Sequence, residues 1–367
     1  MSLGQTDTTH STPSVGVRIE WIDAARGLCV IAVVLFHVGL WHFLKFEHSS
    51  SVAFALWETV ATALGTVRMP LLLAVSGMLA ASKIRNGFSN GKVWNTSLTN
   101  YYLYAVWLLV YALLSIPMAG KGLPHRFGSV GDFFLQLAAP DTPLWFVFAL
   151  AIYLPLLTLC RKLPPAVVLA ALAALRILTA LLVDSDAAQV WKVPELALFF
   201  AIGVYGKSLF LYIAETRTLL YAAVAIPAFL GLSGLSLALD LHPATDQALF
   251  MLRGLAAVVA LVAVISALTR NQAIAAAGSW VGKRTLGVYV LHVPVIDGIV
   301  LAFQGPLAPA APVIANSVPM ALIYPLALTA VVVTACIGLE YLLKKCGLGF
   351  LFRRPQAKTA SRHRQPV

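Results

Sequence analysis

Residues 21–37 read WIDAARGLCVIAVVLFH, and they open the first long apolar run of the chain. The run contains Asp23, Arg26 and His37, polar residues of a kind that membrane-spanning helices ordinarily avoid. Arg26 and His37 are eleven positions apart, which is close to three full helical turns, so a helix carries both on one face. Their separation along that helix is about 16 Å. The stretch predicts a fixed cation near the start of a helix and a titratable base deeper within it.

The composition is that of a membrane protein. Hydrophobic residues make up 60% of the 367 residues and charged residues only 11%, whereas soluble domains are about a quarter charged. The net charge of +11 comes without basic clusters flanked by aromatic residues, so nucleic-acid binding is not expected. The four cysteines form no CxxC pair and no Cys/His cluster, so no metal site is predicted.

Spans of about 20 mostly apolar residues recur along the chain and predict an all-α polytopic membrane protein with about ten transmembrane helices. They cover 22–44, 54–82, 99–119, 143–160, 164–183, 194–213, 219–239, 246–268, 284–304 and 318–343. Most Lys and Arg residues fall on one side of the resulting topology, which favours cytoplasmic N- and C-termini. The predicted organisation is a disordered tail over 1–17, a ten-helix domain over 18–345 and a basic cytoplasmic tail over 346–367.

His37 is the first candidate for chemistry, because an imidazole titrates near neutrality and can take and return a hydroxyl proton. A histidine in a span also serves simply to bond a neighbouring carbonyl group. Arg26 either pairs with Asp23, three residues earlier on the same helix, or binds a phosphate or developing oxyanion. The two roles are compatible, since Asp23 can hold Arg26 in place.

Three further segments carry polar groups within predicted spans. Residues 68–77 read RMPLLLAVSG, and the mid-span Arg68 requires an anionic or carbonyl partner. The Ser76-Gly77 pair permits close helix approach.

Residues 143–150 read PLWFVFAL. Trp145 is expected at the membrane interface, or with Asp141 it contacts a sugar acceptor.

Residues 282–294 read GKRTLGVYVLHVP. Tyr289 and His292 are three positions apart and share a helix face, and His292 is the main rival to His37 as the catalytic base. Lys283 and Arg284 either meet the phosphates of a nucleotide donor or only fix the orientation of the chain in the membrane.

Taken in order, these segments resemble the motifs of the acyltransferase-3 family of integral membrane proteins. The frame Asp23-x-x-Arg26 with His37 resembles its first motif, and the stretches around Arg68, Trp145 and His292 resemble later ones. The resemblance covers most of the chain and implies the membrane-only form, without a fused esterase-like domain.

The resemblance implies an O-acyltransferase, most simply an O-acetyltransferase, in the bacterial cytoplasmic membrane. Its donor is then acetyl-CoA or another acyl-CoA from the cytoplasm, with no permanently bound cofactor, and its acceptor is an envelope polysaccharide or glycolipid. In this hypothesis His37, Arg26, Asp23 and Arg68 form the catalytic group. Donor contacts come from Arg26, Lys283, Arg284, Tyr289 and His292, and acceptor contacts from Trp145 and Asp141.

Two alternatives remain at this point. Intramembrane Arg and His residues also serve transporters or flippases of glycolipids and anionic solutes, although no matched pair of broken helices marks the two halves of the chain. A membrane scaffold leaves the intramembrane arginines without a purpose. The sequence fixes neither the acceptor nor the acyl group, and direct transfer and an acyl-histidine intermediate are both open.

Overall fold

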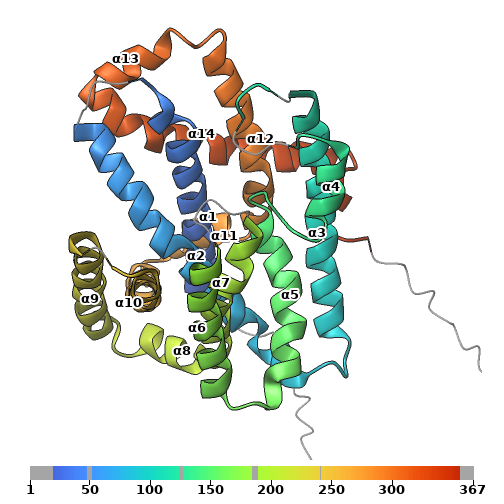
Figure 1. Cartoon of the computed structure of the whole chain (residues 1–367), viewed down its shortest axis with the longest axis vertical. Helices are drawn as coiled ribbons and strands as arrows, with labels where there is room; N and C mark the ends of the chain where they lie inside the picture. The colour runs from blue at the N-terminus through green and yellow to red at the C-terminus, as the bar shows by residue number, and fades with distance from the viewer. Residues whose placement is uncertain are drawn as a thin grey trace, which may run out of the picture.

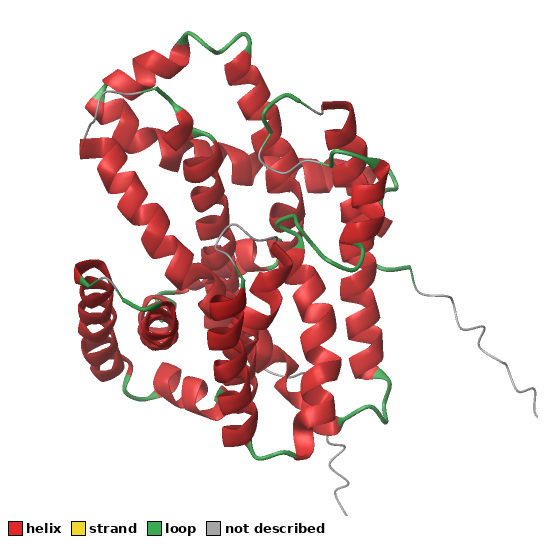
Figure 2. Cartoon of the chain, viewed as in Figure 1, coloured by secondary structure: helices red, strands yellow, loops and turns green. Residues whose placement is uncertain are grey.

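The computed structural model describes residues 20–47, 52–118, 120–123, 127–183, 189–239 and 241–355. All regular structure within these ranges is helical, as the single colour of the elements in Figure 2 shows. The tail predicted over 1–17 lies outside the described residues, as does the basic tail beyond residue 355. The longer helices, together with the short α8 that follows α7, are α1 (Glu20–Trp41), α2 (Val52–Asn86), α3 (Lys92–Ser115), α5 (Trp145–Leu159), α6 (Pro165–Leu182), α7 (Lys192–Tyr205), α8 (Lys207–Glu215), α9 (Thr218–Ala238), α10 (Pro243–Leu268), α12 (Thr285–Gln304) and α14 (Val318–Lys345).

The prediction of an all-α protein with about ten membrane-spanning helices is confirmed. In the part of the chain that the structure describes, nine helices are long and apolar enough to cross a membrane, and a bent pair raises the number to ten. The bent pair replaces the continuous helix predicted over 194–213: the segment ending at Tyr205 and helix α8 meet at 65°. Gly206 ends α7 at this bend, and a side chain on it would crowd the carbonyl oxygen of Ile202.

Three shorter helices occupy stretches that the sequence predicted as connections: α4 (Val130–Gln136), α11 (Gln272–Gly282) and α13 (Ala310–Asn316). Helix α4 starts at a capping box, in which the Ser129 side chain and the Asp132 carboxylate each accept a backbone N–H of the other residue. The Asn271 side chain caps α11 in a similar way, accepting the N–H of Ala273 at 2.9 Å. Local capping therefore forms helices that are too short for a hydropathy search to find.

Helix α1 is the central element of the fold. It packs against α2, α10, α11, α12 and α14, and it lies in the middle of the assembly in Figure 1. Its contact with α11 is especially close: side chains on Gly278 or Gly282 would overlap Ala24 or the carbonyl oxygen of Asp23. Small residues let helix backbones approach in this way in membranes. The approach ties the first turns of α1 to the segment that leads into α12.

A second close approach joins α2 to α7. A Cβ on Gly77 would overlap the carbonyl oxygen of Phe200, and a Cβ on Gly203 would overlap that of Ala74. The Ser76-Gly77 pair therefore permits the close helix approach that the sequence predicted. The contact fixes α7 beside the segment of α2 that carries Arg68.

The proline inside α12, Pro294, leaves one backbone carbonyl without its usual donor, and a side chain of a neighbouring helix bonds that carbonyl instead. Pro294 lacks the N–H that would bond the carbonyl of Val290, one turn earlier. The phenol of Tyr111, from α3, donates to that carbonyl at 2.9 Å. A proline inside a membrane helix is tolerated when a neighbouring helix satisfies the freed backbone group in this manner, and the contact holds α3 against the part of α12 that carries His292.

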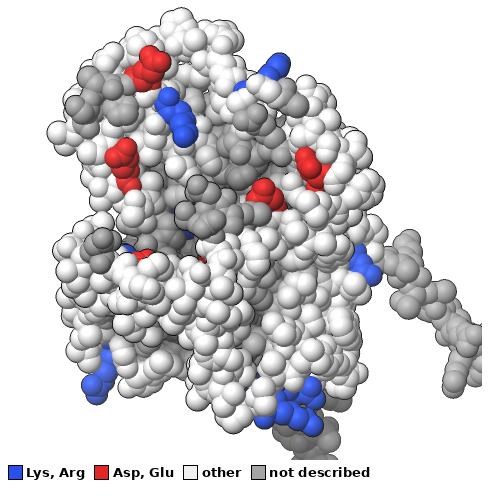
Figure 3. All heavy atoms as spheres, viewed as in Figure 1, with Lys and Arg blue, Asp and Glu red and all other residues white. Residues whose placement is uncertain are grey.

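Charged residues are unevenly distributed over the surface. On the face shown in Figure 3, acidic side chains lie in the upper and middle parts together with a few basic ones, and the charged side chains visible in the lowest part are Lys and Arg among the residues described. The end of α2, the start of α3 and the segment between α5 and α6 carry several basic residues: Lys83, Arg85, Lys92, Arg161 and Lys162. This clustering agrees with the basic asymmetry on which the predicted orientation depends.

Candidate active site

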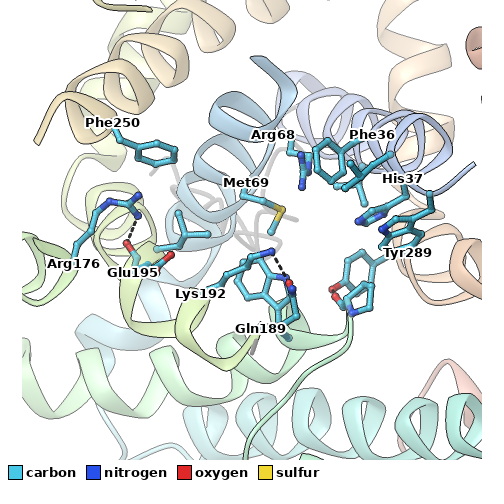
Figure 4. A pocket seen from close by; sticks show the side chains of 17 residues that line it. Phe36, His37, Arg68, Met69, Arg176, Gln189, Lys192, Glu195, Phe250 and Tyr289 are labelled. Atoms are coloured by element: carbon cyan, nitrogen blue, oxygen red, sulfur yellow. Dashed lines mark hydrogen bonds between the residues drawn. The ribbon is translucent and has the colours of Figure 1, made fainter. Parts of the chain in front are cut away.

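A cavity of about 340 Å³ lies beside the second half of α1. Helices α1, α2, α6, α7, α10 and α12 and the residues at the start of α5 surround it, so segments far apart in the sequence meet there. Figure 4 shows two groups of polar side chains around it, one with His37, Arg68 and Tyr289 and the other with Arg176 and Glu195. Of the predicted site residues, His37, Arg68, Trp145 and Tyr289 line this cavity.

His37 and His292 form a hydrogen-bonded pair between α1 and α12. The His37 Nδ1 atom lies 2.9 Å from the Nε2 atom of His292, and the His292 Nδ1 atom lies 2.6 Å from the carbonyl oxygen of Tyr289. A carbonyl oxygen only accepts, so His292 carries its proton on Nδ1 and, when neutral, accepts at Nε2. His37 then donates from Nδ1 and keeps the lone pair on its Nε2 atom.

Aromatic rings fix the plane of His37. Its imidazole stacks on the Trp41 ring, with centroids 3.9 Å apart and planes inclined by 15°, and it meets the Phe36 ring edge-on. His37 lines the cavity whereas the fully buried His292 does not. The two histidines, which the sequence left as rivals, therefore occupy different positions: His37 faces the cavity and His292 lies behind it.

Arg68, on α2, lies on the same side of the cavity as His37 (Figure 4). Its guanidinium carbon lies 3.5 Å from the centroid of the Phe36 ring, a cation–π contact. The residue is 9% exposed. Among the described residues, no group accepts a hydrogen bond from its buried Nε and Nη1 atoms. Buried donors without partners are costly, and an anionic or carbonyl oxygen is the kind of group that these two nitrogens could bond.

The segment before α5 closes one wall of the cavity. The phenol of Tyr289 donates to the carbonyl oxygen of Pro143, and Trp145 is 5% exposed at the start of α5. Asp141 does not line the cavity: its carboxylate accepts the backbone N–H of Gln189 at 2.9 Å. The contact joins this segment to the start of α7.

Arg26 lies away from the cavity, in the first half of α1. Its guanidinium pairs with Asp23 at 3.9 Å and donates to the Thr285 hydroxyl at 3.1 Å. The predicted pair between Asp23 and Arg26 is therefore present. Arg26 and His37, which the sequence placed on one face of α1, both bond residues of α12: Arg26 bonds Thr285, and His37 bonds His292.

Lys283 and Arg284 stand between α11 and α12, next to the start of α1. Lys283 is exposed, and the Arg284 guanidinium covers the Trp280 ring at 4.1 Å from its centroid and donates to the Trp280 carbonyl at 2.9 Å. Neither residue lines the cavity beside His37. The close contact of Gly282 with Asp23 and the hydrogen bond of Arg26 to Thr285 bring the segment that carries both residues beside the first turns of α1.

Several polar residues of the cavity had no role assigned from the sequence. Arg176 and Glu195 are charged residues within the predicted spans 164–183 and 194–213, and the sequence leaves their partners undecided. Arg176 donates to the backbone carbonyl of Glu195 at 2.7 Å and to the side chain of Gln247 at 2.6 Å. The Lys192 ammonium donates to the Gln189 side chain at 2.5 Å. Only the packing of α6, α7 and α10 brings these side chains to one cavity.

Other charged residues within spans pair elsewhere. Glu340 pairs with Lys344 at 2.5 Å, and Arg253 pairs with Asp246 at 3.6 Å. Within the described ranges, no group of three or more His, Cys, Asp or Glu side chains is placed to hold a metal ion.

Comparisons with known proteins identify the family. The sequence profile described as "Acyltransferase domain", that of the acyltransferase-3 family, matches residues 19–340. "Inner membrane protein YcfT" of Escherichia coli (strain K12) is 24% identical over 151 residues, which is 36% of this chain and 41% of that protein. The match thus spans less than half of that relative, and no solved structure matches this chain. Because the profile covers most of the sequence, including all the polar residues of the cavity, the chain belongs to the acyltransferase-3 family of membrane acyltransferases.

Proposed function

We propose that this acyltransferase moves an acyl group, most simply acetyl, from cytoplasmic acyl-CoA to a hydroxyl of a cell-envelope polysaccharide or glycolipid. The observation that carries the proposal is the relay from His37 through His292 to the Tyr289 carbonyl, with Arg68 on the same cavity. The relay leaves a basic nitrogen on His37 and the guanidinium supplies hydrogen-bond donors. Acyl transfer to a hydroxyl needs both kinds of group.

In the direct mechanism, His37 Nε2 takes the proton of the acceptor hydroxyl as its oxygen attacks the thioester carbonyl carbon. The hydrogen bond from His37 Nδ1 to His292 is retained while the imidazole becomes positively charged. Arg68 N–H groups bind the oxyanion that forms on the carbonyl oxygen. Collapse of the tetrahedral intermediate breaks the carbon–sulfur bond, and the departing thiolate takes the proton from His37.

A covalent route uses the same nitrogen. His37 Nε2 attacks the thioester carbonyl carbon, and coenzyme A leaves as the thiolate. The acceptor hydroxyl then attacks the acyl-imidazole, the bond between the acyl carbon and Nε2 breaks, and the hydroxyl proton passes to solvent, which restores neutral His37. The two routes differ in whether an acyl-enzyme forms when donor is present without acceptor. Mass spectrometry of the intact protein after incubation with acetyl-CoA alone distinguishes them.

Donor binding is proposed at the start of α1. Arg26, Lys283 and Arg284 lie near one another there and provide cations for the nucleotide phosphates. Arg26 and His37 are about 16 Å apart along α1, a distance that an extended pantetheine arm can bridge. With the N-terminus in the cytoplasm, the donor enters at the first turns of α1 and the cavity lies in the outer half. The inner-membrane location of the relative supports placement in the bacterial cytoplasmic membrane.

The test is the envelope composition of cells that carry the intact gene, a deletion, or His37→Ala. We expect mass spectrometry of glycans and glycolipids to show one acylated species that disappears in both mutants. His42→Ala is the matched control: it also removes a buried imidazole from the same segment, but His42 bonds Tyr324 at 2.7 Å and does not line the cavity. Retained acylation in His37→Ala would refute the assignment, and accumulation of an unmodified lipid-linked species on the cytoplasmic side would favour a flippase.

A further inference from the structure

The cavity contains a second group of polar side chains, away from His37, that has no part in the acyl-transfer step proposed above. It comprises Arg176, Gln189, Lys192, Glu195 and Phe250, and we call it the Arg176 subsite. Figure 4 shows Arg176, Glu195 and Phe250 on the side opposite His37 and Tyr289, with Lys192 and Gln189 between the two groups. The cavity volume is near the lower limit for small-ligand sites, so the two polar groups are close enough for one sugar-sized ligand to contact both.

The charges that line the cavity do not balance. Its basic side chains are Arg68, Arg176 and Lys192, and its only acidic one among the described residues is Glu195. The ion pairs among the described residues lie elsewhere, so no carboxylate oxygen of a described residue is within 4.0 Å of these three cations. When Arg68 is assigned to the oxyanion, the described side chains of the Arg176 subsite still carry two positive charges and one negative charge. An uncompensated cation inside a membrane protein is costly.

Arg176 is held in a fixed position by its surroundings. Two of its nitrogens donate to the Glu195 carbonyl and to Gln247, and its guanidinium carbon lies 4.0 Å from the centroid of the Phe250 ring. The residue is 4% exposed, and its buried Nε has no acceptor within the described ranges. A guanidinium that is immobilised before the ligand arrives loses little entropy on binding an anion.

Lys192 provides an adaptable second donor. Its ammonium bonds Gln189 at 2.5 Å, which leaves two of its three N–H donors for a ligand. The Glu195 carboxylate and the Gln189 amide add acceptor atoms of the kind that bond sugar hydroxyls. The subsite therefore combines donors for an anion with acceptors for hydroxyl groups.

We propose that the Arg176 subsite binds a carboxylate or phosphate of the acceptor, so that this enzyme acylates a hydroxyl of an acidic sugar unit rather than a neutral one. The inference rests on the proposed function, in that it assumes the acceptor occupies this cavity. Arg176 and Lys192 hold the anionic group, and the hydroxyl to be acylated reaches His37 at the other side. A charge-assisted hydrogen bond contributes about 1.5–3 kcal/mol, which corresponds to roughly a tenfold or larger preference for the acidic ligand.

The test measures binding rather than acyl transfer, so that it stands apart from the proposed function. The full chain is placed in nanodiscs of zwitterionic phosphatidylcholine, and its thermal stabilisation is titrated with galacturonate, galactose 6-phosphate and galactose at equal ionic strength. We expect at least one acidic sugar to bind about tenfold or more tightly than galactose. The carboxylate and phosphate arms then tell which anion the subsite takes.

Four variants make the result specific. Arg176→Gln and Lys192→Gln should each abolish most of the preference, and Lys192→Gln remains informative if loss of Arg176 impairs folding. Arg253→Gln is the matched control, because its guanidinium carbon lies 5.9 Å from the same Phe250 ring but the residue does not line the cavity. His37→Ala should keep the preference even though acyl transfer is lost.

The proposal is overturned if galactose binds the intact protein as tightly as both acidic sugars, or if Arg253→Gln removes the preference as fully as Arg176→Gln does. Failure of the proposed catalytic role of His37 looks different: His37→Ala would then retain acylation while the anion preference stays intact.

Discussion

The Nδ1 atom of His37, on α1, lies 2.9 Å from the Nε2 atom of His292, on α12. The other nitrogen of His292 donates to the Tyr289 carbonyl. When both rings are neutral, both hydrogen bonds therefore form in one arrangement of protons, with each histidine protonated on Nδ1. It leaves the lone pair on His37 Nε2. His292 therefore acts through His37, as a positioning residue, in the way that an oriented second group assists other catalytic bases.

His292→Ala is predicted to lower kcat about 100-fold or more, because proton transfer by a positioned base is worth about 10²–10⁴. His292→Gln places an amide oxygen where His37 Nδ1–H can still donate, so it should recover about tenfold or more of the lost rate. Steady-state kinetics with the purified protein checks both values. Equal losses in the two variants would show that His292 has a role other than orienting His37.

Arg68→Met is predicted to lower kcat by about 10²–10³ with little change in KM for the acyl donor. A donor to the oxyanion acts in the transition state and contributes about 3–4 kcal/mol there. Arg68→Lys keeps the charge but loses the planar fork and its stacking on Phe36, so an intermediate rate is expected. A large rise in KM with unchanged kcat would instead assign Arg68 to binding of the donor.

The sequence predicts the His37 side of the site much better than the other side. His37, Arg68 and His292 are polar residues inside long apolar runs, and their cost in a membrane marks each of them individually. Their division of roles depends on which ring faces the cavity, and this is set by the packing of α1 on α12. Spacing on one helix cannot supply that information.

Arg26 and Arg176 show the limits of the same reasoning. Arg26 shares a helix face with His37, yet that face contacts α12 at both positions, so Arg26 bonds Thr285 instead of reaching the cavity. Arg176 and Lys192 come from α6 and the start of α7, and they meet α10 only in the folded chain. The bend at Gly206 and the short helix α11 were missed because turns and caps, rather than hydropathy, determine them.

Labelling of single cysteines tests the orientation of α1. Lys45 follows the end of α1, and Lys283 is adjacent to Gly282, which packs on the first turns of α1. In a chain whose four native cysteines are replaced by Ala, Lys45→Cys should react with a membrane-impermeant maleimide in intact cells. Lys283→Cys should react only after permeabilisation, since basic segments stay in the cytoplasm. The reverse result would place the cavity in the cytoplasmic half and would contradict the proposed donor route.

Gly282→Ala is predicted to reduce folding strongly, because the added methyl group would overlap the Asp23 carbonyl oxygen at the contact of α11 with α1. Separation of these helices also displaces Arg26 from Thr285. The yield of monodisperse protein and its thermal stability measure the effect. Gly234→Ala, in α9, is the control: a methyl group there meets no atom within 4 Å, so the change should be neutral or slightly stabilising. Similar behaviour of the two variants would contradict the close packing of α11 on α1.

The hydrogen bond of Tyr111 to the Val290 carbonyl can be isolated by a double-mutant cycle with Pro294. Tyr111→Phe should lower the free energy of unfolding by about 0.5–1.5 kcal/mol, because it leaves that carbonyl without a donor. In Pro294→Ala, a restored backbone N–H can bond the same carbonyl, so the additional change Tyr111→Phe should cost clearly less there. Denaturant unfolding in detergent gives the four free energies and hence the coupling between the two sites.

Tyr102→Phe provides the matched control for this cycle. Its phenol donates to the Phe350 carbonyl at 3.2 Å, which Pro294 does not affect, so the cost of removing it should be the same in both backgrounds. If Tyr111→Phe also costs the same with and without Pro294, the phenol is not compensating for the proline, and another group satisfies the Val290 carbonyl. If the costs differ as expected, the proline near His292 depends on α3 for its tolerance. In that case, Tyr111→Phe should also slow acyl transfer, through displacement of the α12 segment that positions His292.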